Sequence, residues 1–325
     1  MTLVETEERP ADDQEALRAE VRLIMATEKL TQQDIAKETG IPYGTFTPWM
    51  GGTYKGDTAD KAALVRRWLE TRRVRARTIS VLPDAPGFVA TPTAMGILDL
   101  LNFAQAAPDF VVVVGGAGIG KTSAIEAQQR RAPNVFVITA DPIMASPNNM
   151  LVGVAEAIGI VEKRSAWVSR AICNRLRGSS GLIIIDEAQH LSTSALDQLR
   201  SIHDTAKIGI AVAGNESLYA RLQGAGGARG SQFAQLFSRV GMRINQPKSK
   251  AKDITALLDA WGLQGDPIVR LLKQIAAKPG ALRNMTKTIR LAHMLAAGSG
   301  ETLDERHVRA AWEQLSATNL DSDAA

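Results

Sequence analysis

Short apolar runs alternate with helical patterns through the middle of the chain. Five such runs predict buried strands, at residues 111–114, 135–139, 181–185, 208–213 and 240–244. Between them, apolar residues at helical spacing predict helices at about 148–158 and 165–176. Strands that alternate with helices are typical of an α/β fold, in which a parallel sheet carries helices on both faces.

Both flanks of this α/β region are helical in pattern. Apolar residues recur at helical spacing from about residue 12 to 70 and again after residue 250. In the first flank, Thr31 can cap a helix, Asp34 stands where a capping box would be completed, and Gly40 supplies a turn before a second helix. Two helices joined in this way are typical of a helix-turn-helix, whose second helix lies in the major groove of DNA.

The second helix of this pair has a core side and a solvent side. Phe46 and Trp49 are three residues apart and face the same core. The exposed positions would be Tyr43, Thr45 and Thr47. Proline inside a helix costs on the order of 3 kcal/mol, so Pro48 predicts a short or bent helix and puts its groove contacts in question. The alternative is a small helical domain that binds protein or has no ligand.

A break in the helical pattern separates the first flank from the α/β region. Arginines give way there to Leu82-Pro83-Asp-Ala-Pro86-Gly87, which is typical of a linker. We therefore predict a helix-turn-helix domain, a linker, an α/β domain and a C-terminal helical domain, at residues 1–70, 71–92, 93–247 and 248–325.

Composition indicates an ordinary soluble protein. The chain has 325 residues, enough for two or three domains, with 45% hydrophobic and 22% charged residues. Its one cysteine, Cys173, excludes a disulfide framework and a cysteine-based metal site. The acidic N-terminus excludes a secretory signal, and no apolar run reaches membrane-spanning length. We expect a cytoplasmic protein with no membrane partner.

Positive charge is concentrated in two stretches, although the net charge is only +4. Six arginines and one acidic residue lie between Arg66 and Arg77. A second stretch contains Lys248, Lys250 and Lys252. Such stretches suit the phosphates of nucleic acids, and a solvated helix face or linker has the same composition.

The most specific motif follows the first predicted strand. Gly115-Gly-Ala-Gly-Ile-Gly-Lys121-Thr122 matches the P-loop pattern G-x-x-x-x-G-K-[ST] between a strand and a helix. Its main-chain N–H groups can surround the phosphates of ATP, and they belong to Gly115, Gly116, Ala117, Gly118, Ile119 and Gly120. Lys121 can reach the β- and γ-phosphates, and the Thr122 hydroxyl can bind Mg²⁺. The alternative is a glycine-rich turn without a ligand.

Polar residues follow the third and fourth predicted strands. Asp186 can hold Mg²⁺ through its water shell, and Glu187 can orient and deprotonate the water that attacks the γ-phosphate. Asn215 follows the fourth strand, where it could sense the γ-phosphate and hold that water. The alternatives are an acid at a helix N-terminus for Glu187 and a turn residue for Asn215.

Two arginines could stabilise charge on the transferring phosphoryl group. Arg239 lies just before the fifth strand, where it could reach the nucleotide of a neighbouring subunit, with Arg229 as a rival for this role. Arg283 begins a helix of the C-terminal domain. Each could instead be an ordinary surface arginine.

Together these motifs resemble those of the AAA+ ATPases. Gly115–Thr122 matches Walker A, and Leu182–Glu187 matches Walker B. Asn215 matches sensor 1, and Gly280–Arg283 matches sensor 2. The resemblance implies the P-loop sheet of that superfamily, with ATP and Mg²⁺ as cofactors and hydrolysis of ATP to ADP and phosphate as the reaction.

A narrower resemblance covers nearly the whole chain. The segments Leu236-Phe-Ser-Arg239 and Lys278-Pro-Gly-Ala-Leu-Arg283, together with the N-terminal helix-turn-helix, make the series similar to the Mu B family of phage transposition activators. The resemblance implies that ATP-bound subunits form a helical filament on double-stranded DNA with little sequence preference. The filament would deliver target DNA to a DDE transposase and stimulate strand transfer, and hydrolysis would drive release. If a phage encodes the chain, the bacterial host cytoplasm is its place of action.

Two other functions fit the same motifs. A transcriptional regulator would read an operator through the helix-turn-helix and use the nucleotide as a switch, and a helicase loader shares the ATPase motifs. The sequence also leaves open which residues contact DNA. Lys248 and Lys250, or Arg164 and Arg170, are unranked candidates, with the N-terminal domain as an auxiliary contact.

Overall fold

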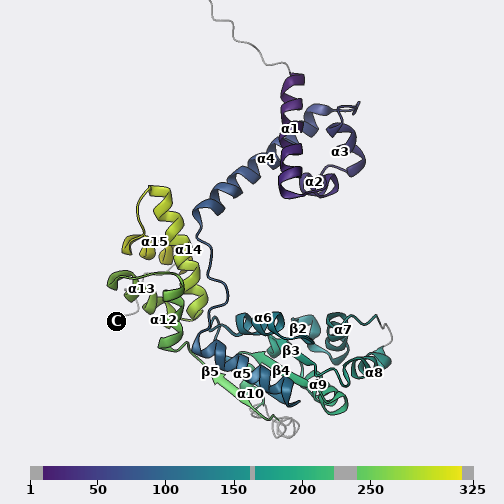
Figure 1. Cartoon of the computed structure of the whole chain (residues 1–325), viewed down its shortest axis with the longest axis vertical. Coiled ribbons are helices and arrows are strands. Elements are labelled where there is room, and N and C mark those ends of the chain that lie inside the picture. The colour runs from purple at the N-terminus through teal and green to yellow at the C-terminus, as the bar shows by residue number, and fades with distance from the viewer. Residues whose placement is uncertain (1–9, 162–164, 223–239, 317–325) are drawn as a thin grey trace, which may run out of the picture. The chain divides into compact units, whose positions relative to one another are not determined.

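The chain forms two compact units, residues 1–83 and 84–325, in the computed structural model (Figure 1). The structure describes residues 10–161, 165–222 and 240–316. The first unit is helical, and the second contains a parallel sheet followed by a group of helices. Among the described helices, none is both long enough and apolar enough to span a membrane.

Four helices enclose the core of the first unit. Their bounds are α1 Pro10–Glu28, α2 Gln32–Thr39, α3 Tyr43–Met50 and α4 Thr58–Val81. Each helix contributes side chains that are fully buried in this core, among them Val21, Ile35, Phe46, Trp49 and Val65. The unit therefore has an apolar core of its own, as the helical spacing in the first flank predicted.

The turn between α2 and α3 has the predicted geometry. The Thr31 side chain accepts a hydrogen bond from the Asp34 amide at 3.2 Å, and the Asp34 carboxylate accepts one from the Thr31 amide at 2.9 Å. Gly40 follows α2 with a φ of 73°, a left-handed conformation that favours glycine. Phe46 and Trp49 stack with ring centroids 6.2 Å apart. The two helices and their turn are therefore confirmed.

The second helix of this pair is short, as its proline predicted. α3 has eight residues and contains Pro48. Two arginines of α1 bind its last carbonyls: Arg18 donates to the Trp49 oxygen at 2.8 Å, and Arg22 donates to the Met50 oxygen at 3.2 Å. Cations stabilise the negative end of a helix dipole, so α1 fixes the end of the helix that proline shortens.

The last helix of the first unit is longer than the sequence suggested. Residues 71–81, which we assigned to the linker, are helical and continue α4 to Val81. Arginine and alanine favour helix, and the first helix-breaking residue on this path is Pro83. Leu82 is extended, as expected of a residue before proline, and the helix ends before it. The pattern break near residue 71 marks the loss of the apolar face and not the end of the helix.

A five-stranded parallel sheet is the centre of the second unit. Its strands are β1 Phe110–Gly115, β2 Val135–Thr139, β3 Leu182–Asp186, β4 Gly209–Gly214 and β5 Arg243–Gln246. They lie in the order β2-β3-β4-β1-β5, and each neighbouring pair is parallel. The first four predicted strands are confirmed to within one residue at each end. The fifth was predicted to begin three residues and to end two residues too early, because β5 is a partly exposed edge strand whose apolar pattern is weak.

Helices cover both faces of this sheet (Figure 1). They are α5 Pro92–Ala106, α6 Lys121–Arg131, α7 Pro147–Ala157, α8 Ser165–Leu176, α9 Thr193–Ala206 and α10 Glu216–Leu222, with the short 3₁₀ helices η1 Pro142–Ala145 and η2 Ala188–His190. α5 and α6 pack against Val111 and Val113, whereas α7, α8 and α9 pack in the core that contains Val112 and Val114. Alternate side chains of β1 enter opposite cores, so both faces of the strand are buried and its sequence is an unbroken apolar run.

Four helices complete the second unit. Their bounds are α12 Ala251–Ala260, α13 Asp266–Ala277, α14 Ala281–Ser299 and α15 Glu305–Ser316. They share a core in which Leu272, Ile275, Met285 and Ile289 are fully buried. The predicted C-terminal helices are therefore confirmed.

A buried carboxylate joins the sheet region to these helices. Asp253, in the first turn of α12, has no exposed surface. It accepts hydrogen bonds from the Thr93 amide at 2.8 Å, the Thr93 hydroxyl at 2.6 Å and the Lys250 amide at 2.8 Å. Thr93 lies in the first turn of α5, so one carboxylate satisfies N–H groups at the starts of two helices.

Candidate nucleotide-binding site

Two glycines shape the loop between β1 and α6. Gly118 and Gly120 have φ angles of 78° and 101°, which residues with a side chain rarely adopt. Gly118 also has no room for a side chain, because a Cβ there would lie 2.0 Å from the main-chain oxygen of Gly280. The loop therefore brings its main chain directly against the start of α14. A glycine-rich loop at a helix N-terminus suits the binding of phosphate.

Lys121 begins α6 and lies over the loop. Its Nζ donates hydrogen bonds to the main-chain oxygens of Gly115 at 2.8 Å and Gly116 at 3.0 Å. Burial lowers the pKa of its ammonium group, an effect that nearby Asp186 and Glu187 oppose and Arg283 reinforces. The lysine is thus a half-buried cation in a polar setting, which suits the charge of a nucleotide phosphate.

Oxygen donors converge where β3 ends beside α6. The Thr122 hydroxyl donates a hydrogen bond to the Asp186 carboxylate at 2.7 Å, and the other Asp186 oxygen accepts one from the Glu187 amide at 2.9 Å. Asp186 is 2% exposed. A hydroxyl and a carboxylate, both hard oxygen ligands, form a donor set that fits Mg²⁺.

Glu187 is held by its backbone and by a neighbouring glutamine. Its φ of 54° lies in the left-handed region, which is uncommon for a residue with a side chain. Gln189, in η2, donates a hydrogen bond to the Glu187 carboxylate and accepts one from the Asn215 amide at 3.3 Å. Gln189 therefore connects the carboxyl ends of β3 and β4.

A cleft of about 430 Å³ brings the predicted residues together. Lys121, Glu187 and Asn215 line it from the sheet region, and Arg283 lines it from α14. Asn215 also uses its side-chain oxygen to accept a hydrogen bond from the Ser217 amide at 3.0 Å, as a turn asparagine does. Ligand clefts commonly measure on the order of 300 to 1,000 Å³, so this one has room for a nucleotide.

Comparison with known proteins agrees with this geometry. Family models match residues 105–222, described as an AAA domain, and residues 238–315, described as the C-terminal part of Mu B transposition protein. The chain is 37% identical over 309 residues to the ATP-dependent target DNA activator B of Escherichia phage Mu, covering 94% of this chain and 96% of that protein. It belongs to the Mu B family.

A second relative and a solved structure extend the comparison. This Mu B family member is 34% identical over 267 residues to the Mu-like prophage FluMu DNA transposition protein B of Haemophilus influenzae, covering 81% of this chain and 92% of the relative. A chain in the structure of Drosophila ORC bound to DNA matches with a TM-score of 0.50 and 14% identity, over 74% of this chain and 65% of that one. That match shows the fold alone. The Mu B family member is an AAA+ ATPase.

The segment before α5 forms a wall of the cleft that the sequence did not reveal. Pro86, Gly87, Val89 and Thr91 line the cleft. Val89 also packs against the core of the C-terminal helices, whereas Phe88 packs against the core of α5 and α6, where Arg131 lies 4.9 Å from its ring centroid. The signal was the apolar pair Phe88-Val89 inside a stretch whose prolines and glycine indicated only a linker.

Several predicted arginines lie outside the described residues. These are Arg164, Arg229 and Arg239. The other candidates for DNA contact, Lys248, Lys250 and Arg170, are exposed. Arg170 lies 5.8 Å from the ring centroid of Trp167, a cation–π arrangement.

Half of the arginine-rich stretch is paired within the first unit. The ion pairs join Arg66 to Asp13, Arg72 to Glu28 and Glu38, and Arg73 to Glu20 and Glu70. For these three arginines, the interpretation as a solvated helix face is the better one. In α3, Tyr43 and Thr47 are exposed and Thr45 is half-buried.

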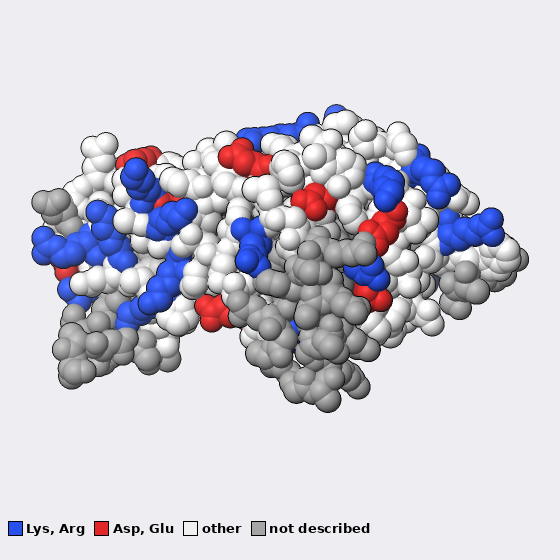
Figure 2. All heavy atoms as spheres, turned by 90° about the horizontal axis from the view of Figure 1, so that it is seen from below, with Lys and Arg blue, Asp and Glu red and all other residues white. Residues whose placement is uncertain are grey.

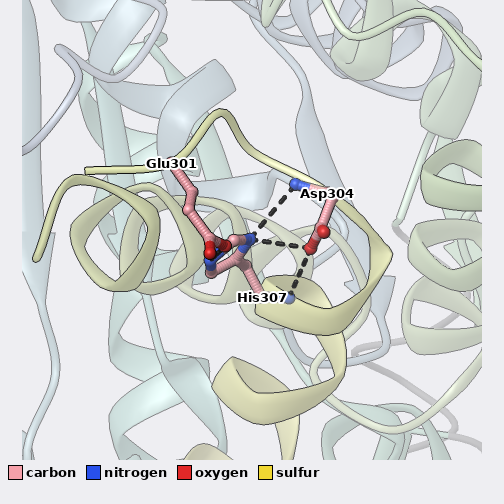
Figure 3. Close-up of side chains that lie close together, drawn as sticks. All are labelled: Glu301, Asp304 and His307. Carbon is pink, nitrogen blue, oxygen red and sulfur yellow. Dashed lines mark hydrogen bonds and ion pairs between the residues drawn. The ribbon is translucent and has the colours of Figure 1, made fainter. Parts of the chain in front are cut away.

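One further cluster has the composition of a metal site. Ligand atoms of Glu301, Asp304 and His307 lie within 4.8 Å of one another (Figure 3). Asp304 precedes α15 and accepts a hydrogen bond from the His307 amide at 3.2 Å, which is the geometry of a helix cap. Arg306 pairs with Asp304 at 2.8 Å and with Glu301 at 3.3 Å. Capping of α15 and the ion pairs to the Arg306 side chain therefore explain why these residues lie together.

Proposed function

We propose that this protein is an ATP-dependent target selector for DNA transposition. Its ATP-bound subunits form filaments on double-stranded DNA with little sequence preference, deliver that DNA to a DDE transposase and stimulate strand transfer. ATP hydrolysis then drives release. The observation that supports this proposal most directly is the relationship to the phage Mu activator, which spans 94% of the chain and includes both halves of the nucleotide cleft.

In this proposal the cleft binds and hydrolyses ATP. The main chain of Gly115–Gly120 and the Lys121 ammonium bind the phosphates. Thr122 and, through its water shell, Asp186 would hold Mg²⁺, which would neutralise charge on the phosphates. Glu187 orients and deprotonates the attacking water, and Asn215 holds that water beside the γ-phosphate.

Arginines on both sides of the cleft complete the proposed site. Arg283 lines the cleft from α14 and would place positive charge beside the transferring phosphoryl group. Arg239 would act on the nucleotide of a neighbouring subunit, with Arg229 as the rival. Such a shared site would make hydrolysis depend on assembly, because one subunit would supply a group that the other lacks.

DNA binding in this proposal is mainly electrostatic. Figure 2 shows a face on which Lys and Arg side chains are more prominent than Asp and Glu. The exposed residues Lys248, Lys250 and Arg170 are the candidates within the described chain for phosphate contacts. The α2–α3 pair would be an auxiliary contact, since it retains helix-turn-helix geometry but its second helix is short.

Imaging of the protein on DNA tests this proposal. Random-sequence duplex DNA would be mixed with the protein and ATP, ADP or no nucleotide, and examined by negative-stain electron microscopy. Filaments that require ATP would support the target selector. Nucleotide-independent binding of dimers at discrete sites would favour a regulator that reads an operator, a function for which the α2–α3 geometry is the supporting observation.

Two variants separate ATP binding from ATP hydrolysis. Lys121→Ala should lose ATP-dependent DNA binding, whereas Glu187→Gln should bind ATP, hydrolyse it slowly and remain on DNA. Stimulation of turnover by a replicative helicase, and not by a transposase, would indicate a helicase loader.

A further inference from the structure

We propose that Gln189 is a positioning residue that holds Glu187 and Asn215 in register for ATP hydrolysis, and that Arg221 fixes Gln189. The proposal rests on the proposed role of Glu187 as the base. It concerns a side chain that no sequence motif singled out. Gln189 is not among the described residues that line the cleft, so it acts through its neighbours and not on the nucleotide.

Both ends of the Gln189 amide are in use. Its Nε2 donates to the Glu187 carboxylate, and its Oε1 accepts from the Asn215 main-chain amide at 3.3 Å. A primary amide has one donor end and one acceptor end, so this pair of neighbours fixes its orientation: turning it over would place a donor against a donor and an acceptor against a carboxylate. One side chain therefore sets the separation between the carboxyl ends of β3 and β4.

Arg221 holds the main chain around Gln189. From α10, its guanidinium donates to the oxygen of Gln189 at 2.9 Å and to the oxygen of Leu191 at 2.7 Å. Two bonds from one planar guanidinium to carbonyls two residues apart restrain both the position and the direction of this segment. Burial removes water from Arg221 and lowers the pKa of its guanidinium from the ordinary value.

The arrangement forms a closed loop of contacts. α10 begins at Glu216, directly after Asn215, and Arg221 returns from α10 to the segment that carries Gln189. Glu187, with its left-handed φ of 54°, is thereby tied to Asn215 through Gln189, and Gln189 is tied to α10 through Arg221. Misplacing a reacting group by about 1 Å can slow catalysis about 100-fold, so such restraint matters for turnover.

Replacements at Gln189 test the proposal in the full-length chain. Gln189→Met keeps the length of the side chain and removes both hydrogen bonds, and Gln189→Glu keeps the acceptor but sets a negative charge against Glu187. Both should lower kcat for ATP hydrolysis by about 10- to 100-fold, with KM and the affinity for a fluorescent ATP analogue within about twofold of wild type. A role in packing alone predicts normal turnover in both variants, since both fill the same space.

A matched control and a variant at a second site distinguish a specific effect on turnover from a general loss of structure. Gln198, also half-buried, donates to the Ser169 hydroxyl at 3.0 Å and is not among the described lining residues, so Gln198→Met should leave kcat unchanged. Arg221→Lys can reach only one of the two carbonyls and should lower kcat without changing KM. Thermal unfolding of every variant would verify that the fold is intact.

Three results would overturn the inference. They are kcat within twofold of wild type in either Gln189 variant, a loss of analogue affinity that parallels the loss of turnover, and normal kcat in Arg221→Lys. Glu187→Gln, assayed in parallel, separates this inference from the proposal beneath it. Unchanged turnover in Glu187→Gln would contradict both the proposed role of Glu187 as the base and the inference about Gln189. Slow turnover in Glu187→Gln together with normal turnover in the Gln189 variants would contradict only the inference.

Discussion

Gly118 shows how the absence of one side chain allows two walls of the nucleotide cleft to meet. Its φ of 78° disfavours any side chain, and a Cβ there would collide with the Gly280 oxygen, 2.0 Å away. Gly118→Ala should therefore push the loop and the start of α14 apart. We expect ATP affinity, measured by titration calorimetry, to fall at least about tenfold, which corresponds to about 1.4 kcal/mol.

Gly298 offers a control for this substitution on the same helix, α14. It is exposed, its φ is not left-handed, and a Cβ there would meet no atom within 4 Å. Gly298→Ala should keep wild-type ATP affinity and unfold at an equal or higher temperature, because alanine favours helix. Equal ATP affinity in the two variants would contradict the steric argument at Gly118.

Among single residues, the sequence predicted those that belong to contiguous motifs. Lys121, Thr122 and Asp186 belong to patterns whose spacing is fixed by a strand and a loop, and the structure brings them together. Gln189 and Val89 could not be predicted, because Asn215 and the core of the C-terminal helices lie far from them in sequence and meet them only in the folded chain. Glutamine after a Walker B strand and valine in a linker are ordinary residues until those contacts are known.

The cap of α2 gives a prediction at the scale of elements. Thr31→Ala removes the side-chain oxygen that accepts from the Asp34 amide and should destabilise the first unit by about 1 kcal/mol. Hydrogen exchange of the α2 amides in the full-length chain would measure this loss. Thr27→Ala is the control, because the exposed Thr27 hydroxyl donates a hydrogen bond to the Leu23 oxygen within α1 and caps no helix. Equal exchange in the two variants would argue against the cap.

The same cap should make α2 sensitive to acid. Hydrogen bonds from the Thr31 side chain and amide hold the pKa of Asp34 below its ordinary value of 3.8. A lowered pKa in the folded state gives stability that is present above 3.8 and is lost as the pH falls through the lowered value. Exchange of the α2 amides, corrected for intrinsic rates, should therefore quicken below pH 3.8 in wild type more than in Thr31→Ala. Equal acid sensitivity would count against the assignment.

The join between α5 and α12 should be strongly sensitive to loss of its carboxylate. Asp253→Ala would leave the buried Thr93 amide and the partly buried Lys250 amide without their acceptor, which should destabilise the second unit by about 2 to 4 kcal/mol. Thr93→Val removes only the hydroxyl contact and should cost about 1 kcal/mol. Urea unfolding of the full-length chain measures both. A smaller loss for Asp253→Ala than for Thr93→Val would contradict this account.

The apolar pattern predicted the elements whose apolar residues follow one another closely and misplaced the bounds of two elements, β5 and the end of α4, that have few buried side chains. The three inner strands β1, β3 and β4 were placed to within one residue, because all of their residues are buried. The edge strand β2 is partly buried, and its bounds were predicted because residues 135–138 form an unbroken apolar run. β5 was predicted to begin three residues and to end two residues too early, and α4 was ended about ten residues early, since both continue with few buried side chains. Local propensity, not the apolar pattern, keeps residues 71–81 helical.

At the scale of the whole molecule, the division into units predicts an independent nucleotide site. Every described residue that lines the cleft lies between Pro86 and Lys287, within the second unit. A protein that begins at Asp84 should therefore fold and bind ATP with an affinity within about twofold of the full-length chain. Calorimetric titration would test this, with Lys121→Ala in the same fragment as the non-binding control. Loss of ATP binding on removal of residues 1–83 would contradict the assignment of the site to one unit.

The whole-chain resemblance was predictable because several motifs follow one another in a fixed order. The family was confirmed by the two relatives, at 37% and 34% identity. DNA contacts were not predictable, because exposed lysines and arginines look alike in sequence whether or not they are paired. Arg72 and Arg75 belong to the same stretch, yet the structure pairs Arg72 with Glu28 and Glu38 across the helices of the first unit.

The bond between Asp253 and Thr93 also has a consequence for biosynthesis. These two residues lie 160 positions apart, and the helix that supplies Arg283 comes later still. At typical rates of translation, a ribosome needs on the order of ten to thirty seconds to pass from the first residue of the pair to the second. Once Glu187 has been added, in the second half of that interval, the nascent chain has both Walker motifs but still lacks the wall of the cleft that α14 supplies. The newborn protein should therefore be unable to retain ATP until synthesis is nearly finished, so it would not load onto DNA while still attached to the ribosome.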